Sequence, residues 1–220
     1  MHLAWPRRLA AMFLAAVMCS LPAGTGHAVA VPASVGSDIS PSRFPSLRAV
    51  ARIFPEYRGG TRELIGGRQL SVTADDCLYL DLAATQPRAG TTASYANRRG
   101  ESPFFTGGTN AVVAVYDFRR PKRAQAALDE ERDTIESCYG RHDDGGYGTT
   151  FSPLDAPSLA MDEFSYRRVS RDASTGRDWF IFTYMRERRF LVLNFLQRDR
   201  NAPGARSAFR LARASVRAVS

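Results

Sequence analysis

The stretch that decides the fold covers residues 178–197 and reads DWFIFTYMRERRFLVLNFLQ. Its alternating pattern predicts two antiparallel strands joined at Glu187-Arg188, although this turn lacks the Gly or Asn that two-residue turns prefer. Because successive side chains of a strand point to opposite faces, one face of the hairpin collects six large apolar side chains. They are Phe180, Phe182, Tyr184, Leu191, Leu193 and Phe195. The pattern therefore predicts that this face is buried in a core.

The opposite face of the hairpin is apolar with two polar insertions, Thr183 and Asn194, beside Trp179. The predicted pairing makes Thr183 and Asn194 diagonal neighbours. An apolar surface with a few polar groups is typical of a ligand cleft, so these three residues are candidates for ligand binding. A covering helix that hydrogen-bonds the two polar side chains explains the pattern at least as well.

Segments outside the hairpin complete an α+β pattern. Residues 159–169 predict another strand, and residues 111–116 are apolar on both alternating faces, which is typical of a central strand covered on both sides. The spacing of apolar residues predicts helices over residues 47–54, 121–138 and 203–219. The predicted fold class is therefore α+β, a twisted antiparallel sheet flanked by helices.

Turn-forming residues separate these elements. Residues 68–73 predict a short strand, and Asp75 or Asp76 is a candidate cap for a brief helix that carries Cys77. Residues 87–108 and 141–157 are rich in glycine and in other turn-forming residues, so we expect mostly loops there.

The N-terminal segment has the features of a secretory signal. Two arginines precede an apolar run of about a dozen residues, and an Ala-x-Ala sequence ends at Ala30. We expect cleavage after Ala30, with Ala28 as the alternative. An uncleaved anchor is the other interpretation, but the apolar run is too short to span a bilayer.

Cys19 raises the alternative of a lipidated protein. Met18 argues against it, because a bulky side chain stands where lipoprotein processing needs a small one. The expected organisation is a signal peptide at residues 1–30, a flexible leader at residues 31–45 and a single α+β domain at residues 46–220.

Two cysteines remain after this cleavage, Cys77 and Cys138, and an oxidising compartment favours a disulfide between them. The bond closes a loop of about 60 residues. By restricting the unfolded chain it should stabilise the fold by about 4 kcal/mol. Helical spacing also places Cys138 on the inward side of its helix. We therefore expect an extracellular protein, either secreted or associated with the cell envelope.

The 220 residues include 30 Lys and Arg against 22 Asp and Glu, a net charge of +8 with His neutral. This charge favours an anionic envelope component, or a lipid head group through peripheral membrane contact, with an unidentified small molecule as another partner. The export signal disfavours nucleic acid. Four arginines project from one side of the last predicted helix, as anionic-surface candidates or as a solvated face: Arg206, Arg210, Arg213 and Arg217.

Side chains for catalysis are scarce. After cleavage the chain has one histidine, His142, which argues against a hydrolase that needs a base near its nucleophile and against a nitrogen-liganded metal. No phosphate-binding glycine motif follows a strand, so we expect no cofactor. Carboxylate pairs at residues 75–76, 143–144 and 162–163 leave the alternative of a carboxylate-dependent hydrolase of envelope carbohydrate or peptidoglycan. The pair at residues 162–163 is excluded as a local dyad, because strand neighbours point to opposite faces.

Several segments resemble the PknH-like extracellular sensor-domain family of actinobacteria. The resemblance rests on Phe54-Pro55-Glu56-Tyr57 after a short helix, on Asp76-Cys77, and on residues 110–138, where an apolar strand leads into an Ala-rich helix that ends at a cysteine. It implies a twisted antiparallel sheet, a broad cleft, and ligand sensing or binding without catalysis. Members of the family typically carry two disulfides, whereas this chain can form one. The expectation is an exported, non-enzymatic ligand-binding or sensor-like domain.

Overall fold

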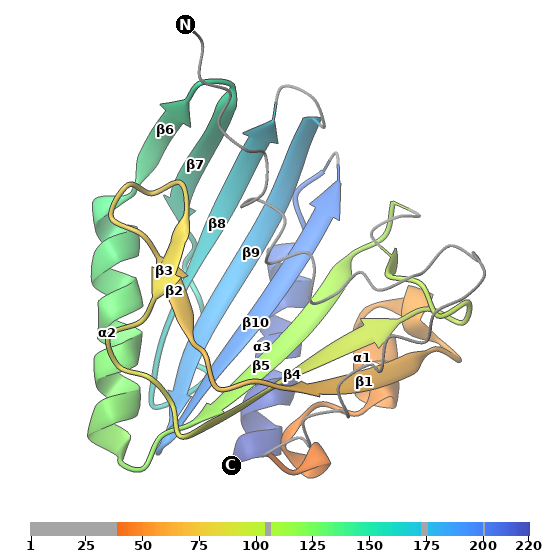
Figure 1. The fold of residues 1–220 in the computed structure, drawn as a ribbon. Helices are drawn as coiled ribbons and strands as arrows, with labels where there is room; N and C mark the ends of the chain where they lie inside the picture. Colours follow the sequence, from red (N-terminus) through yellow and green to blue (C-terminus); the bar gives the residue numbers. More distant parts are fainter. Residues whose placement is uncertain (1–38, 104–106, 173–175, 200) are drawn as a thin grey trace, which may run out of the picture. The chain divides into compact units, whose positions relative to one another are not determined.

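One antiparallel sheet of eight strands organises the chain (Figure 1). The structure is a computed structural model, which describes residues 39–103, 107–172, 176–199 and 201–220. The strands stand in the order β1-β4-β5-β10-β9-β8-β7-β6. Their bounds are β1 Thr61–Gly66, β4 Ala89–Ala96, β5 Asn110–Asp117, β6 Gly140–Asp144, β7 Tyr147–Pro153, β8 Asp162–Asp172, β9 Gly176–Glu187 and β10 Phe190–Asp199. The predicted α+β fold class is confirmed.

The β9–β10 hairpin turns one residue later than expected, at Arg188-Arg189, because Glu187 pairs with Phe190. Arg188 adopts a φ of 55°, which supplies the left-handed backbone that such turns need without a glycine. The register differs by two residues from the predicted one, so every side chain keeps its predicted face while its partner changes. Thr183 consequently lies directly opposite Asn194.

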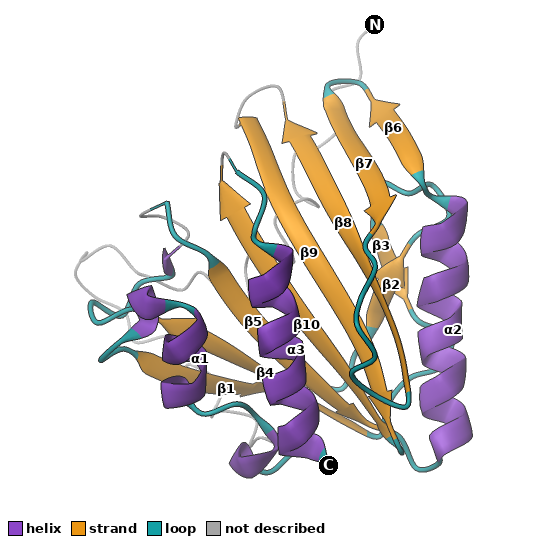
Figure 2. Cartoon of the chain, turned by 180° about the vertical axis from the view of Figure 1, so that it is seen from behind, coloured by secondary structure: helices purple, strands orange, loops and turns teal. Residues whose placement is uncertain are grey.

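Helices cover both faces of the sheet. We call the two faces the α2 face, which carries Tyr184 and Leu193, and the α3 face, which carries Met185 and Val192. The α2 face packs against α2 (Pro121–Ser137) and a small hairpin of β2 (Ser71–Thr73) and β3 (Leu80–Leu82). The α3 face packs against α1 (Leu47–Ile53) and α3 (Ala205–Val219), which Figure 2 shows in front of the sheet. All three predicted helices are confirmed.

Two separate cores follow from this layering. On the α3 face, Ile181, Met185 and Val192 are buried with Leu211 of α3. On the α2 face, the buried set includes Tyr184 and Leu191 of the hairpin. Strands β5, β9 and β10 contribute side chains to both faces, which explains why their sequences are apolar nearly throughout.

Two segments expected to be loops form strands. In β4, Ala93 and Tyr95 are buried on the α3 face, and the intervening Ser94 lies on the other face. The alternation was hidden because small residues and threonines stand where long apolar ones are usual. The other segment forms the β6–β7 hairpin, whose turn uses Gly145 and Gly146 at positive φ.

The brief helix expected at Asp75 or Asp76 does not form. Asp76 Oδ1 instead accepts hydrogen bonds from the backbone N–H groups of Leu78 and Tyr79, at 2.8 and 3.1 Å. Cys77 between them has a φ of 63°, outside the right-handed helical region. The segment is thus a turn that joins β2 to β3.

The folded region begins before Ser46. Two 3-10 turns, η1 (Pro41–Arg43) and η2 (Pro55–Tyr57), flank α1. Ile39 and Phe44, placed by the sequence in a flexible leader, are 5% and 3% exposed in the core on the α3 face. The predicted signal peptide and Cys19 lie outside the described residues. Within the part of the chain that is described, no helix has both the length and the apolarity to cross a bilayer.

Candidate functional site

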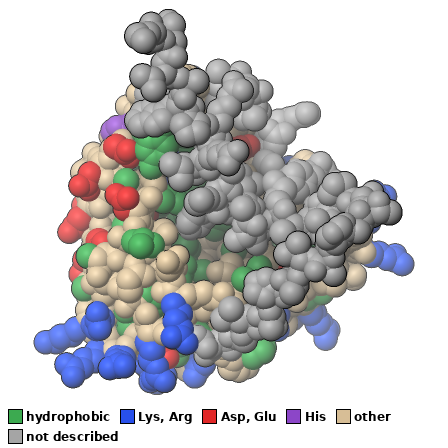
Figure 3. Space-filling view, viewed as in Figure 1, with side chains coloured by type: hydrophobic (Ala, Val, Ile, Leu, Met, Phe, Trp, Pro, Cys, Tyr) green, Lys and Arg blue, Asp and Glu red, His purple; other side chains and the backbone are tan. Residues whose placement is uncertain are grey.

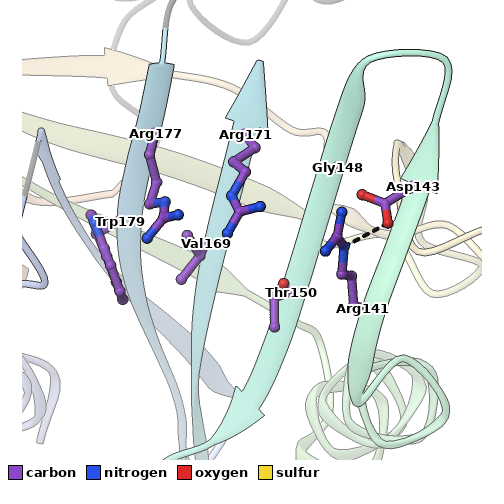
Figure 4. A pocket seen from close by; sticks show the side chains of 8 residues that line it. All are labelled: Arg141, Asp143, Gly148, Thr150, Val169, Arg171, Arg177 and Trp179. Carbon is purple, nitrogen blue, oxygen red and sulfur yellow. Dashed lines mark hydrogen bonds and ion pairs between the residues drawn. The ribbon is translucent and has the colours of Figure 1, made fainter. Parts of the chain in front are cut away.

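A cavity of about 200 Å³ opens on the α3 face, at the end of the sheet formed by β6 to β9 (Figure 4). Each of these four strands contributes two lining residues, spaced two apart along its chain. They are Arg141 and Asp143 of β6, Gly148 and Thr150 of β7, Val169 and Arg171 of β8, and Arg177 and Trp179 of β9.

Strand register assembles the lining into two rows that cross the sheet. One row runs through Asp143, Gly148, Arg171 and Arg177, which are successive cross-strand partners. The second row lies two residues along each strand: Arg141, Thr150, Val169 and Trp179. The site is therefore a consequence of pairing between strands, and no single segment contains it.

The cavity carries an excess of positive charge. Arg171 and Arg177 stand directly opposite each other on neighbouring strands, an arrangement of like charges that destabilises a sheet. Arg141 is compensated, because its Nε lies 2.6 Å from Asp143 Oδ2. Neither Arg171 nor Arg177 forms an ion pair with another described residue. The lining thus holds three guanidinium groups against one carboxylate.

Trp179 and Gly148 help to position the charged side chains of the cavity. The Arg177 guanidinium carbon lies 5.8 Å from the centre of the Trp179 ring, so the indole supports it through a cation–π contact. Gly148 leaves space for the Asp143 carboxylate, because a Cβ at this position would overlap Asp143 Oδ1. A larger residue at position 148 would therefore displace the partner of Arg141.

The arrangement suits the binding of an anion. Guanidinium groups present planar donors that match the oxygens of phosphate and carboxylate, and an anion between Arg171 and Arg177 would relieve their repulsion. Among the described residues that line the cavity, only Thr150 carries a hydroxyl group. The one carboxylate, that of Asp143, is already paired with Arg141.

The fold itself has known counterparts, although the sequence matches neither a protein-family model nor a curated protein. The extracellular domain of PknH from Mycobacterium tuberculosis superposes with a TM-score of 0.52 and 14% identity, over 81% of this chain and 93% of that one. This chain has a PknH-like fold. An uncharacterised protein from Mycobacterium smegmatis matches with a TM-score of 0.47 and 10% identity, over 81% of this chain and 98% of that one.

The three cleft residues expected from the sequence have different surroundings. Trp179 lines the cavity, but Thr183 and Asn194 lie under α3 and are 1% and 2% exposed. Ser215 of α3 donates a hydrogen bond of 2.7 Å from its Oγ to Asn194 Oδ1. An open cleft at Thr183 and Asn194 is therefore replaced by the alternative, a covering helix that hydrogen-bonds one of them.

The structure also shows where the other residues of interest in the sequence lie. The Cys77–Cys138 disulfide is confirmed, with the two Cα atoms 5.5 Å apart. The four arginines of α3 are all exposed, on the side of the helix away from the sheet. His142 of β6 lies with its Nε2 2.8 Å from the carbonyl oxygen of Cys138.

The carboxylates of Asp162 and Glu163, one of the pairs considered for a hydrolase, are held by local hydrogen bonds. Asp162 receives hydrogen bonds from Gln125 and Arg132, at 2.6 and 2.7 Å. Burial alone would raise the pKa of Asp162, but these two partners outweigh it and lower that pKa. Glu163 points to the other face, as predicted, and accepts from the backbone N–H groups of Leu159 and Ala160. Among described residues, no group of three or more His, Cys, Asp or Glu side chains could hold a metal ion.

Sequence reasoning missed Glu131 of α2, which is 1% exposed. Its carboxylate accepts hydrogen bonds from the Thr73 backbone and hydroxyl and from the hydroxyls of Tyr166 and Tyr184, at 2.7 to 3.2 Å. Burial nevertheless raises its pKa above the ordinary value. A signal was present, because Glu131 stands four residues from Ala127 and from Ile135 on the inward stripe of the helix.

Proposed function

We propose that this protein is an extracellular, non-enzymatic domain that binds an anionic ligand in the arginine-lined cavity, as a ligand-binding or sensor-like module of the cell envelope. The observation that carries the proposal is the direct opposition of Arg171 and Arg177 without a carboxylate partner among described residues. Such an arrangement costs stability in the empty domain, and an anion between the two groups recovers it.

The size of the cavity indicates what it holds. Pockets that enclose drug-sized molecules measure roughly 300–1,000 Å³, and this one measures about 200 Å³. It therefore suits a small anion, or the phosphate or carboxylate end of a larger envelope component whose remainder lies in an adjoining, more open hollow of about 610 Å³ that shares Arg171 and Arg177. The Trp179 ring beside Arg177 offers an apolar surface for the portion next to the charge.

Three observations support the extracellular setting. The N-terminal segment has the pattern of a secretory signal, and the Cys77–Cys138 disulfide suits an oxidising compartment. The PknH structure of similar fold is itself an extracellular domain. Proteins of one fold bind different ligands, so the ligand class depends on the chemistry of the cavity.

The test is calorimetric titration of the purified protein with pyrophosphate as the probe. We expect the double variant Arg171→Gln/Arg177→Gln to bind pyrophosphate at least about tenfold more weakly than wild type, because it loses charge-assisted hydrogen bonds. The matched control is Lys122→Gln/Arg123→Gln, which removes the same charge from exposed residues of α2 and should bind as wild type does. Equal loss in both variants, or no binding by wild type, would contradict the proposal.

A further inference from the structure

We propose that α1 and α3 together form a docking face for the surface of an anionic lipid bilayer. Six exposed arginines, which we call the basic helix face, make up this surface: Arg48 and Arg52 of α1, and Arg206, Arg210, Arg213 and Arg217 of α3. Neither helix contains an aspartate or a glutamate. The proposal is independent of the ligand cavity.

Packing of the two helices makes the face continuous. Both lie on the α3 face of the sheet, as Figure 2 shows, and an Arg210 Nη2 donates to the carbonyl oxygen of Arg52 at 3.4 Å. The opposite side of α3 is buried through Leu211, Ala212 and Val216. The arginines must therefore point away from the sheet.

The charges of this face are uncompensated within the described part of the chain. None of the six arginines forms an ion pair with a carboxylate among the residues that the structure describes. Like charges at helical spacing repel one another, and each of the two helices keeps such pairs on its outer side. Uncompensated repulsion over two packed helices is the feature that an external anionic partner would relieve.

The layout of the charges favours an extended surface over a small ligand. Arg206 and Arg217 are separated by about 16 Å along the helix axis at 1.5 Å per residue. The six arginines come from two helices and are all exposed, and none of them is among the residues that line the ligand cavity. Clusters of four to eight basic residues on an amphipathic helix are typical of contact with anionic head groups.

An aromatic side chain distinguishes a bilayer from a soluble polymer. Phe209, half-buried, flanks the arginine stripe of α3 one residue before Arg210. Aromatic and basic residues side by side suit the boundary between head groups and acyl chains, where the ring leaves water and the charges stay with the head groups. A soluble polyanion offers the ring no such environment. The partner of the basic helix face is therefore a bilayer.

The experiment is co-sedimentation of the full chain with vesicles of phosphatidylcholine containing about one third phosphatidylglycerol. We expect binding that weakens between about 50 mM and about 300 mM salt, because salt screens the contact. The quadruple variant Arg206→Gln/Arg210→Gln/Arg213→Gln/Arg217→Gln should bind at least about tenfold more weakly. The wild type and every variant carry the same N-terminal segment, so binding to pure phosphatidylcholine vesicles measures the contribution of that segment to vesicle binding.

Two further variants keep the test decisive. The variant in which the same four arginines are replaced with lysine retains the charge and should retain vesicle binding. The thermal melt of this variant reveals any loss of fold. Lys122→Gln/Arg123→Gln removes charge from exposed residues of α2, on the opposite face of the sheet, and should bind vesicles as wild type does. Undiminished binding by the quadruple glutamine variant overturns the proposal. So does binding to soluble polyglutamate with no binding to the anionic vesicles.

Discussion

Glu131 is the residue on which the contacts of the α2 face converge. Its carboxylate connects α2 to β2 through Thr73, to β8 through Tyr166 and to β9 through Tyr184. Because the group is buried without a cationic partner among its hydrogen-bond donors, its ionised form is costly despite these bonds. The raised pKa of Glu131 follows from this burial.

The dependence of the free energy of unfolding on pH should reflect the titration of the Glu131 carboxyl group. With its pKa raised above the ordinary 4.5, the folded chain binds the Glu131 proton more tightly than the unfolded chain does. Its stabilising contribution is therefore complete below pH 4.5 and decreases as the pH rises through the raised value. Glu131→Gln does not titrate, so the wild type should lose stability relative to it over this range in urea unfolding.

At low pH the same variant should be less stable than wild type by about 1–3 kcal/mol, because a glutamine amide nitrogen facing the Thr73 N–H cannot accept its hydrogen bond. A difference between the two proteins that stays constant from pH 4 to pH 8 would show that Glu131 titrates alike in the folded and unfolded chains.

Gly90 of β4 makes a second prediction at the scale of one residue. A Cβ there would overlap the carbonyl oxygen of Gly67 and lie 2.8 Å from the Tyr116 ring, so Gly90→Ala should destabilise the domain by about 1–3 kcal/mol. Gly67→Ala is the matched control, because a Cβ at Gly67 has no neighbour within 4 Å. Thermal unfolding compares the two. Equal melting temperatures would mean that the strands move apart at little cost.

At the scale of elements, the β2–β3 hairpin depends on α2. The hairpin has two three-residue strands, too short to be stable alone. The disulfide from Cys77 ties it to the end of α2, and Glu130 of the same helix accepts from the backbone N–H groups of Ala84 and Thr85 just after β3. Helix and hairpin therefore form one unit over the α2 face.

Loss of the disulfide should weaken this unit. The bond joins residues 61 apart in sequence, so removing it frees the unfolded chain and should lower the free energy of unfolding by about 4 kcal/mol. Urea unfolding of Cys77→Ser/Cys138→Ser against oxidised wild type measures the difference. Reductant should bring wild type to the stability of the variant and leave the variant unchanged. A stability that reductant does not alter would contradict the prediction.

At the scale of the whole molecule, charge differs between regions of the surface. Figure 3, viewed onto the α2 face, shows Asp and Glu side chains gathered beside α2 and the small hairpin, and Lys and Arg along the lower edge. The arginine-lined cavity and the basic helix face both lie on the other side of the sheet, the α3 face. Both proposed contacts with anions therefore belong to the same side.

The limits of the folded domain can be tested at this scale. Ile39 and Phe44 are buried, and Arg43 donates a hydrogen bond to the carbonyl oxygen of Val219 at the end of α3. A chain that begins at Ser46 should therefore be less stable than one that begins at residue 38 by about 3 kcal/mol or more. Phe44→Ala in the full chain is the control and should account for most of the loss. Equal melting temperatures would place these residues outside the cooperative unit.

Local sequence patterns were sufficient for prediction where the spacing of apolar residues within one element shows which of its sides is buried. The alternation in residues 178–197 identified the core face of the β9–β10 hairpin even though the turn lies one residue later. Helical spacing placed Cys138 on the inward side of α2, and the count of cysteines named its partner. Strands β1, β3, β4, β6 and β7 were not predicted. In β4, β6 and β7 the core-facing residues are small or polar, so these strands lack a clear apolar alternation.

The sequence by itself determined the fold class, the three helices and the disulfide, since each depends on spacing within a segment or on the number of cysteines. Only the tertiary structure decided where ligands meet the surface. The eight residues of the cavity come from four strands, two from each. The two residues of any one strand do not indicate a binding site in the sequence, because the site forms only when strand pairing places Arg171 opposite Arg177. Long-range pairing is a property of the folded chain, whereas periodicity reports only which side of one element is buried.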